Sequence, residues 1–347
     1  MLLLNYKPVL HQPTGIGVYA NAVLPALQRF EHVLIPGGGS GGTKERLKRL
    51  AWSQYQLPRL GIKKKADLIF TPAPEGYLGE QVVPQVVMAH DLRPLTHLEI
   101  SMQSLYFKYW VPPLLKQCRL ILTNSHFTAS EIQRATGVPQ AKIRVTSLGY
   151  DSKHFYPSDS YRHFHNRPYF LHVGQPYPHK NIRALLYAFS QIAAEQSDVD
   201  LVLAGKTHET ETSRLRSIAS ALAIENRVKF IHYVDYARLP DLYRGALAFV
   251  FPSLWEGFGL PILEAMACGI PVITSYGSAT EEVAGSNALL IDPQQPGQIY
   301  SAMKEILLSS DLRQKLINRG LSHVARFSWE RCKSETYDYI SELIAYS

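Results

Sequence analysis

Short runs of β-branched and aromatic residues, each followed by turn residues and a helical pattern, recur along the whole chain. In the first half this pattern predicts strands at 32–35, 68–70, 85–89, 120–123 and 143–147, and helices at 18–30 and 127–135. Such alternation is typical of α/β units, in which a helix returns the chain to the start of the next parallel strand. The chain is therefore expected to fold around parallel sheets.

The alternation stops between Asp151 and Pro168, where no apolar period is present, and we place a linker there. A second series follows, with strands expected at 169–173, 201–204, 228–233, 247–251 and 271–274, and helices near 182–195, 214–223 and 261–268. The 347 residues are enough for two hydrophobic cores, on a typical domain size of about 150 residues. We predict an α/β fold with two doubly wound, Rossmann-like domains, 1–157 and 166–326, followed by a last segment, 327–347.

Basic residues are concentrated in the first half of the chain. Residues 1–150 carry 17 Lys and Arg against 8 Asp and Glu, whereas residues 151–347 carry 19 against 21. This asymmetry indicates an anionic partner of the first half, which composition leaves open as nucleic acid, a membrane surface or a phosphorylated substrate. No nucleic-acid reading module accompanies the basic residues, so we expect no nucleic-acid partner.

The three cysteines, Cys118, Cys268 and Cys332, lie far apart without C-x-x-C spacing. This favours reduced thiols over a disulfide or zinc framework. The apolar runs are shorter than the roughly 18 residues that span a bilayer, and residues 1–6 are too short for a signal peptide. A cytoplasmic protein is expected.

One basic segment, 44–65, also carries an apolar pattern, because Leu47, Leu50, Ala51 and Tyr55 fall near one face of a helix. A helix of this kind can lie on an anionic membrane surface. It can equally pack its apolar face on its own domain and leave its charges in solvent. Both interpretations stay open, so peripheral membrane contact is one alternative for this chain.

The most informative segment, 251–269, leaves a strand, turns through Gly257 and Gly259, and enters a helix with Pro261 near its start. Glu256 lies in the turn and Glu264 is expected on the first helical turn. Both carboxylates can then accept hydrogen bonds while backbone N–H groups of the turn stay free for an anion, which suits a nucleotide sugar. The plainer alternative is that Glu264 complements the helix dipole and Glu256 is solvated.

This segment resembles the retaining glycosyltransferases of family 4, which have the GT-B fold and a signature of two glutamates separated by seven residues in such a loop. The resemblance extends over nearly the whole chain and is greatest to bacterial mannosyltransferase-like members that build surface polysaccharides. Its other matching segments are 14–19, 90–92, 124–125, 173–174 with 180–181, and 282–285.

The resemblance implies two Rossmann-like domains that face a central cleft. The first domain would bind the acceptor, the second a nucleoside-diphosphate sugar, and 327–347 would cross back to the first domain. Glu256 would bind hydroxyls of the donor sugar and Glu264 those of the ribose. Transfer would retain the anomeric configuration.

Lys180 lies in a loop after a predicted strand and can place a positive charge beside a diphosphate leaving group. Many family members have an Arg directly after the glycine of this loop, whereas this chain has Gln175. Neutralisation of the phosphates would then rest on Lys180, with Lys206 or His179 as weaker candidates. The nucleobase pocket is expected near Val234. The full set of expected donor-binding residues is Gly15, Gly17, Gly174, Lys180, Lys206, Val234, Gly257, Phe258, Gly259, Leu260 and Glu264.

His90 and Glu256 are the residues expected to act at the transferred sugar. His90 follows the apolar run 86–89, so it should lie at the carboxyl end of a strand. The resemblance puts a histidine here against the sugar, whereas a structural histidine is the plainer alternative. The family is thought to use departure and attack on one face of the sugar, because no carboxylate is positioned as the nucleophile that retaining glycosidases need. We therefore expect no glycosyl-enzyme intermediate.

Two patterns suggest other chemistries and are set aside. The segment 36–44 contains G-x-S-x-G around Ser40 and resembles a P-loop. A P-loop, however, needs Lys followed by Ser or Thr after its last glycine, and here Thr43 precedes Lys44. A flexible glycine-rich loop is the simpler interpretation.

No metal site and no cofactor are expected. Asp198 and Asp200 imitate an Asp-x-Asp metal motif, but they precede a strand and so fall at the edge of the sheet opposite the ligand. His163 and His165 lie in the linker without companion ligands and are interpreted as solvated surface residues.

Together these features predict a retaining glycosyltransferase that moves a hexose, mannose from GDP-mannose, onto a glycan or lipid-linked glycan. A UDP-sugar transferase of the same family is the main alternative. A sugar-nucleotide epimerase and a non-catalytic nucleotide-binding adaptor are alternatives from other classes, and the paired glutamates disfavour the adaptor.

Overall fold

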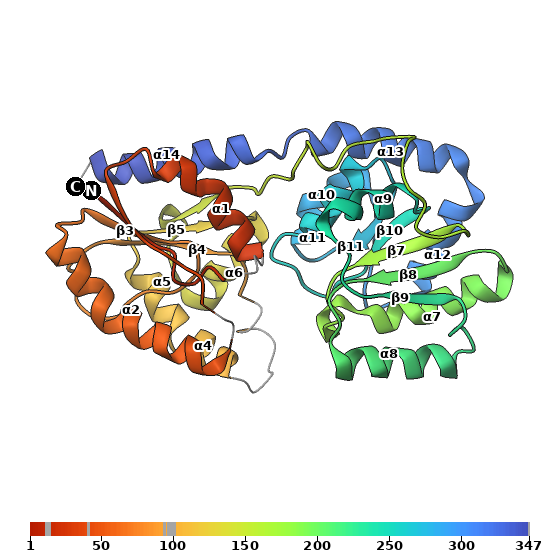
Figure 1. Cartoon of the computed structure of the whole chain (residues 1–347), viewed down its shortest axis with the longest axis horizontal. Coiled ribbons are helices and arrows are strands. Elements are labelled where there is room, and N and C mark those ends of the chain that lie inside the picture. The colour runs from red at the N-terminus through yellow and green to blue at the C-terminus, as the bar shows by residue number, and fades with distance from the viewer. Residues whose placement is uncertain (11–14, 40–41, 93–94, 96–101, 346–347) are drawn as a thin grey trace. The chain divides into compact units, whose positions relative to one another are not determined.

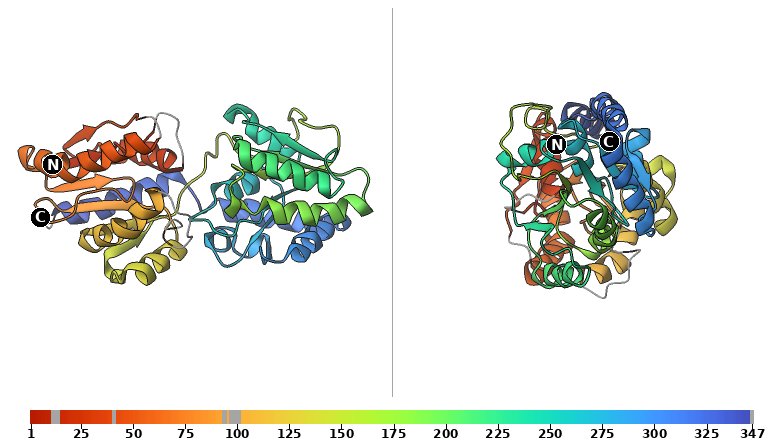
Figure 2. Two further views of the ribbon diagram at one scale, coloured as in Figure 1. Left: turned by 90° about the horizontal axis from the view of Figure 1, so that it is seen from below. Right: turned by 90° about the vertical axis from the view of Figure 1, so that its right-hand side faces the viewer.

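The computed structural model describes residues 1–10, 15–39, 42–92, 95 and 102–345. The chain divides into two compact units: Met1–Gly149 with Trp329–Ser347 (unit 1), and Tyr150–Ser328 (unit 2). Each unit has its own sheet and its own core, and helices cover both faces of each sheet (Figures 1 and 2).

Unit 1 contains a six-stranded parallel sheet in the order β2-β1-β3-β4-β5-β6. Its strands are β1 (Leu2–Asn5), β2 (His32–Ile35), β3 (Leu68–Thr71), β4 (Gln85–Ala89), β5 (Leu120–Thr123) and β6 (Ile143–Val145). The sequence pattern predicts all of these except β1, whose four residues are fully buried between β2 and β3.

The helices of unit 1 are α1 (Gly15–Leu27), α2 (Thr43–Lys63), α4 (Met102–Tyr109), α5 (Val111–Gln117), α6 (His126–Thr136) and α14 (Trp329–Ala345). The last helix of the chain, α14, runs beside α1 on one side of the sheet (Figure 1). Tyr19 and Thr336 lie within 3.5 Å of each other through their hydroxyls, and the rings of Phe30 and Tyr337 stack at 4.5 Å. Burial of these side chains fastens the end of the chain to unit 1.

Unit 2 contains a six-stranded parallel sheet in the order β12-β11-β10-β7-β8-β9. Its strands are β7 (Tyr169–Val173), β8 (Asp200–Ala204), β9 (Val228–Ile231), β10 (Ala248–Phe251), β11 (Val272–Ser275) and β12 (Leu289–Ile291). In chain order this is the Rossmann arrangement 3-2-1-4-5-6, so the predicted doubly wound fold is confirmed. The strand order reverses between β7 and β10, and ligands of open α/β sheets bind at the carboxyl ends of the strands at such a point.

The main helices of unit 2 are α7 (Ile182–Glu195), α8 (Glu209–Ala221), α9 (Leu239–Arg244), α10 (Leu260–Ala267), α11 (Ala279–Ala284), α12 (Pro296–Leu308) and α13 (Ser310–Val324). Helices α9, α10 and α11 lie on one side of the sheet, and α7 and α8 lie on the other (Figure 1). Phe170, Phe189 and Leu201 are fully buried in a core that the sheet shares with α7, α8 and α12.

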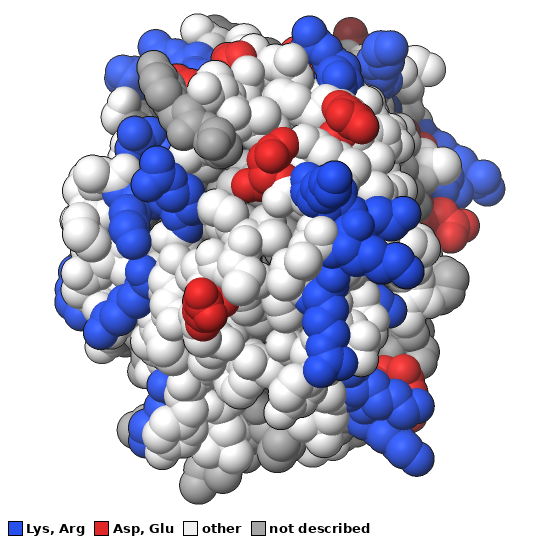
Figure 3. Space-filling view, turned by 90° about the vertical axis from the view of Figure 1, so that its left-hand side faces the viewer, with Lys and Arg blue, Asp and Glu red and all other residues white. Residues whose placement is uncertain are grey.

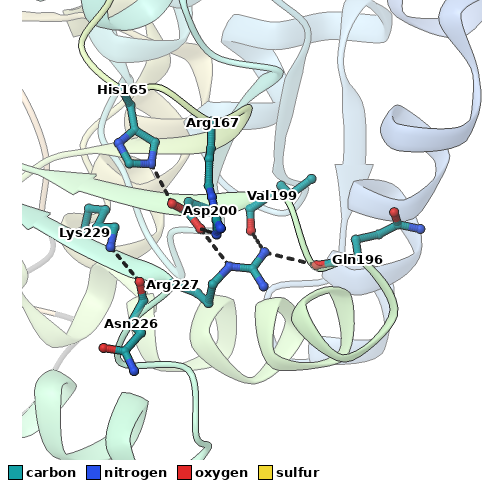
Figure 4. A network of polar contacts seen from close by, with 8 residues as sticks. All are labelled: His165, Arg167, Gln196, Val199, Asp200, Asn226, Arg227 and Lys229. Carbon is teal, nitrogen blue, oxygen red and sulfur yellow. Dashed lines mark hydrogen bonds and ion pairs between the residues drawn. The ribbon is translucent and has the colours of Figure 1, made fainter.

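The segment before β7 is held to unit 2 by a buried carboxylate (Figure 4). Asp200, the first residue of β8, binds His165 Nε2 at 2.6 Å and Arg227 Nε at 2.7 Å, and Arg167 lies 3.6 Å away. The prediction that His165 is a solvated surface residue is wrong, because its ring is largely covered and hydrogen-bonded. Asp200 lies at the amino end of its strand, which is the edge opposite the ligand edge.

Candidate active site

The loops after β7 and β10 bring two oppositely charged side chains together at the strand-order reversal of unit 2. Lys180 Nζ lies 2.6 Å from Glu256 Oε1, and the two side chains are only 16% and 13% exposed. The ammonium also lies 4.9 Å from the centre of the Phe251 ring. A cation and a carboxylate that are this sheltered interact more strongly than a surface pair. The two predicted residues therefore meet, and each neutralises the other.

The loop that carries Lys180 is fixed by the next residue, Asn181. Its backbone adopts a left-handed conformation (φ 57°) that starts α7. Its side-chain amide donates to the carbonyls of Pro252 (3.2 Å) and Pro293 (2.6 Å). Asn tolerates this conformation better than most residues do. Asn181 thus connects the loops that follow β7, β10 and β12 and limits where Lys180 can lie.

The ends of β7 and β8 approach each other through two glycines. Gly174 and Gly205 have φ angles of 157° and 154°. A Cβ atom on Gly205 would lie 2.2 Å from the carbonyl oxygen of Gly174, so this position excludes every other residue type. Gly174 is one of the predicted donor-binding residues. Gly205 is not, although its place directly after an apolar strand is a signal that could have found it.

A small pocket opens beside these glycines at the carboxyl ends of β7, β8 and β9. It is lined by Gly174, Pro176, Ile182, Leu203, Ala204, Gly205, Thr207, Thr212, Leu215, Phe230, Ile231 and His232. Its wall is largely apolar, with backbone groups of the glycine turns at its rim. Val234 lies two residues beyond this wall and is half-buried, and Lys206 is exposed at its edge.

The second glutamate lies on α10. Gly259, with φ 108°, starts this helix, and Glu264 is its fifth residue. The prediction that Glu264 lies on the first helical turn is therefore wrong by about one residue. This weakens the helix-dipole interpretation, because that effect is confined to the first turn.

The fully buried Tyr243 donates a hydrogen bond of 2.8 Å to Glu264 Oε2. Burial raises the pKa of Glu264 to about 7, while this hydrogen bond lowers it. A carboxylate that accepts from one hydroxyl and keeps further lone pairs can accept from a ligand diol. Nothing in the sequence pattern marks Tyr243, because a buried aromatic residue is expected in any core.

His172 lies on β7 behind Gly174 and is fully buried. Its Nδ1 lies 3.0 Å from the carbonyl oxygen of Val250, which fixes Nδ1 as the donor and leaves Nε2 as an acceptor. Burial, with a smaller contribution from the Lys180 charge, lowers the pKa of His172 to about 4. The ring is therefore neutral near pH 7. The sequence analysis does not identify this residue.

The remaining predicted residues of unit 2 form the turn between Glu256 and α10. Gly257 and Leu260 are half-buried, whereas Phe258 is buried with its ring edge-on to Phe327 at 6.1 Å. Phe258 thus anchors the turn to the unit. Gln175 is half-buried beside Gly174.

Unit 1 holds the other predicted residues. His90 follows β4 as predicted, and its Nε2 donates to the carbonyl oxygen of Pro72 at 3.1 Å. The Tyr19 ring meets it edge-on at 5.2 Å. Burial lowers the pKa of His90 to about 4, so the imidazole is neutral near pH 7 and Nδ1 is left as an acceptor.

Gly15 and Gly17 form the first turn of α1, which begins three residues earlier than predicted. A Cβ on Gly15 would meet no atom of the described residues within 4 Å, so the described part of unit 1 does not require a glycine there. Among the residues that the structure describes, no group of three or more His, Cys, Asp or Glu side chains could hold a metal ion.

The geometry of unit 2 suits a phosphorylated sugar ligand. The Lys180 ammonium can bind phosphate, and the carboxyl groups of Glu256 and Glu264 can accept hydrogen bonds from hydroxyls. Comparison with known protein families also indicates a protein that acts on sugars. The family described as "Glycosyl transferases group 1" matches residues 158–323, and that described as "Glycosyltransferase Family 4" matches residues 15–154.

Curated relatives extend this match. The O-antigen chain mannosyltransferase B of Escherichia coli is 33% identical over 299 residues, which cover 83% of this chain and 76% of that protein. The O-antigen chain mannosyltransferase RfbU of Salmonella typhimurium is 30% identical over 322 residues, which cover 89% of this chain and 85% of that protein.

Solved structures agree on the fold. The sucrose-phosphate synthase of Thermosynechococcus elongatus superposes with a TM-score of 0.79 at 21% identity, over 100% of this chain and 99% of that one. Anabaena HepE in complex with UDP-glucose superposes with a TM-score of 0.78 at 18% identity, over 99% of this chain and 100% of that one. The chain therefore belongs to glycosyltransferase family 4 and is a glycosyltransferase with the GT-B fold.

Proposed function

We propose that this glycosyltransferase moves mannose from GDP-mannose onto a glycan or lipid-linked glycan, with retention of the anomeric configuration. Two relatives at 30% identity or more are named O-antigen chain mannosyltransferases, which favours this sugar and this class of acceptor. The observation that carries the proposal is the sheltered Lys180–Glu256 pair at the strand-order reversal of unit 2.

In this proposal the donor separates the pair. The diphosphate takes Lys180 as its counter-charge, and Glu256 then accepts hydrogen bonds from the sugar hydroxyls. Lys180 stabilises the negative charge that grows on the leaving phosphate, which is where fixed charges contribute most to catalysis. Because Gln175 is uncharged, Lys180 is the principal cation of this site, with Lys206 and His179 in weaker roles, and no metal ion is required.

Glu264 binds the ribose hydroxyls, and the apolar pocket beside Gly174 and Gly205 holds the nucleobase near Val234. The ionised form of Glu264 accepts two hydrogen bonds from a diol, whereas the protonated form competes as a donor. Since burial sets the pKa of Glu264 at about 7, nucleotide binding should strengthen as the pH rises through 7.

Unit 1 supplies the acceptor site and His90, whose neutral ring contacts the transferred sugar, while Gly15 and Gly17 let backbone approach the donor phosphates. Leaving-group departure and acceptor attack take place on the same face of the sugar, with no covalent sugar on Glu256. Intact-mass spectrometry during turnover with donor should find unmodified enzyme. A glycosyl adduct on Glu256 would refute this mechanism.

The donor is tested by thermal-shift titration with GDP, UDP, ADP and their sugar conjugates. A ligand at one hundred times its Kd stabilises a folded protein by about 2.7 kcal/mol. We expect GDP and GDP-mannose to stabilise the wild type, and Glu264→Ala to lose most of this effect. Glu225→Ala, which removes an exposed glutamate, is the matched control and should respond like the wild type.

A UDP-sugar is the second candidate donor, because HepE, a protein of the same fold, has been solved with UDP-glucose. If only UDP and its conjugates stabilise the protein in the same titration, the donor is a UDP-sugar and the rest of the proposal is unchanged. The absence of stabilisation by any nucleotide would refute the proposed site.

A further inference from the structure

Helix α2 of unit 1 has a packing face and an outer face. Ser53, Leu57 and Gly61 are buried at four-residue intervals and form the packing face, where Leu57 joins the core of unit 1. A Cβ on Gly61 would lie 3.0 Å from Val83, so the helix is held close to the unit. Helix α2 therefore packs against the rest of unit 1 through this one face.

The outer face also carries apolar residues. Tyr55 and Ile62 are 62% and 57% exposed, and they lie two helical turns apart on the same stripe. Leu47 and Ala51 continue this stripe toward the start of the helix and are exposed as well. The sequence left open whether these residues pack on their own domain. In the structure they do not, so their exposure requires another explanation.

Cations lie along one edge of this stripe. Lys44, Lys48, Arg59 and Lys63 are exposed on the same side of α2, and Lys64 and Lys65 follow directly. The only acidic residue of the helix is Glu45, which pairs with Lys48. The view onto unit 1 in Figure 3 shows Lys and Arg in broad bands with few, scattered carboxylates.

A second helix of unit 1 has a similar exposed composition. On α4, Leu105 and Tyr109 are exposed one turn apart, with the exposed Lys108 between them in sequence. Both helices are fastened to the same short segment, because Arg49 of α2 binds Glu75 and Tyr106 of α4 donates to the carbonyl oxygen of Pro74. The two exposed sets therefore belong to one region of unit 1.

We propose that the outer face of α2 lies on an anionic lipid bilayer, with Tyr55 and Ile62 inserted at the boundary between headgroups and acyl chains and the flanking cations on lipid phosphates. Alternating apolar and basic side chains on one helical face match this interface. A second copy of the chain would bring like charges face to face. Nucleic acid would use the cations, but it offers no apolar layer for Ile62. Within the described residues, no helix is long and apolar enough to cross a membrane.

The test is cosedimentation of the whole protein with vesicles of phosphatidylcholine alone and of phosphatidylcholine mixed equally with phosphatidylglycerol. We expect binding to the anionic vesicles only. The variant Arg59→Gln/Lys63→Gln should bind about 25-fold more weakly, since each basic residue near such a surface contributes about a fivefold factor. Tyr55→Ser/Ile62→Ser should also weaken binding at least tenfold.

The matched control is Lys315→Gln/Arg319→Gln, which removes two exposed cations at the same spacing from α13 of unit 2. It should bind vesicles like the wild type. All substituted residues are exposed, so the variants should keep the melting temperature of the wild type. They should also keep its nucleotide-induced thermal shift, which separates this test from that of the proposed function.

Three results would overturn the proposal. One is equal binding to both kinds of vesicle, or to neither. Another is full binding by Tyr55→Ser/Ile62→Ser, because adsorption by charge alone does not need the apolar stripe. The third is a wild-type protein that binds a DNA duplex tightly but shows no preference for anionic vesicles. If Arg59→Gln/Lys63→Gln abolished this DNA binding, nucleic acid would be the partner of the α2 face.

Discussion

The two units have related sheets but very different polar interiors at their ligand edges. In unit 2, both predicted glutamates have a side-chain partner: the Lys180 ammonium pairs with Glu256, and the neutral Tyr243 hydroxyl donates to Glu264. In unit 1, the predicted His90 is neutral and bound to a backbone carbonyl, and no atom of the described residues would contact a Cβ on Gly15. A sheltered ion pair of unit 1, Arg49–Glu75, instead joins α2 to the segment after β3. The comparison indicates that the predicted donor-binding side chains of unit 2 are held in place before a ligand arrives, whereas His90 of unit 1 offers a neutral contact. Organised electrostatics of this kind need no rearrangement when charge develops.

The largest expected effect concerns the pair in unit 2. Glu256→Gln should lower the rate of hexose transfer about a thousandfold, as loss of a key transition-state contact does. Transfer of labelled hexose from the donor that stabilises the wild type measures this. The exposed Glu225→Gln is the control and should keep the full rate. A reduction of less than tenfold would mean that Glu256 does not contact the reacting sugar.

The next prediction assigns stability to one end of the unit 2 sheet and nucleotide binding to the other. Asp200→Asn should lower the free energy of unfolding by about 3 kcal/mol, because it leaves Arg227 without its buried counter-charge and His165 without its carboxylate partner. Nucleotide binding should not change, since Asp200 lies at the opposite end from Lys180. Urea unfolding and the nucleotide thermal shift measure the two quantities. A loss of nucleotide binding in the folded variant would contradict this separation.

The same carboxyl makes a pH prediction. Burial raises the pKa of Asp200, but hydrogen bonds from His165 and Arg227 lower it more, so the net shift is downward. Its contribution to stability is therefore present above the unfolded pKa of about 4 and is lost as the pH falls through the folded value. The difference in stability between wild type and Asp200→Asn should shrink on acidification below pH 4.

A smaller effect is expected in unit 1. His90→Ala should lower transfer about a hundredfold, the typical contribution of one positioned polar group. It should leave nucleotide binding unchanged, because the nucleotide contacts proposed for Glu264 and Lys180 lie in unit 2. Parallel measurement of transfer and of the thermal shift distinguishes the outcomes. A variant that loses both would place His90 in nucleotide binding and remove the contrast between the units.

The smallest effect comes from Tyr243→Phe. The Tyr243 hydroxyl lowers the pKa of Glu264, so its removal should raise that pKa above about 7. Less carboxylate is then present at pH 7, and nucleotide binding should weaken about fivefold there. Affinity should recover near pH 9. A variant with uniformly weaker binding at every pH would indicate a packing defect instead.

Sequence patterns predict the sheets well because parallel strands buried on both faces are continuous apolar runs between turn residues. They place Lys180 and Glu256 in loops after strands and Glu264 on the helix that follows, and the resemblance to family 4 adds the donor-binding roles that remain predictions. They miss β1, a four-residue strand with no turn signal before it. They also miss Tyr243, His172 and Gly205, whose importance arises from neighbours far away in sequence: Glu264, Val250 and Gly174.

The error at His165 has the same origin. A histidine in a polar linker is usually solvated, and only the fold brings the Asp200 carboxylate to it. The orientation of α2 is a related case. Its periodicity allows two apolar faces, and only the packing of Leu57 and Gly61 tells which one is left exposed.

The most direct test of the central claim is isothermal titration of GDP and GDP-mannose into wild type, Lys180→Met and Glu256→Gln. If Lys180 exchanges Glu256 for the diphosphate, Lys180→Met should lose GDP binding. Glu256→Gln should bind GDP as tightly as the wild type or more tightly, because its lysine is already free, and should lose the extra affinity that the sugar supplies. Equal GDP affinity in Lys180→Met and wild type would contradict the account.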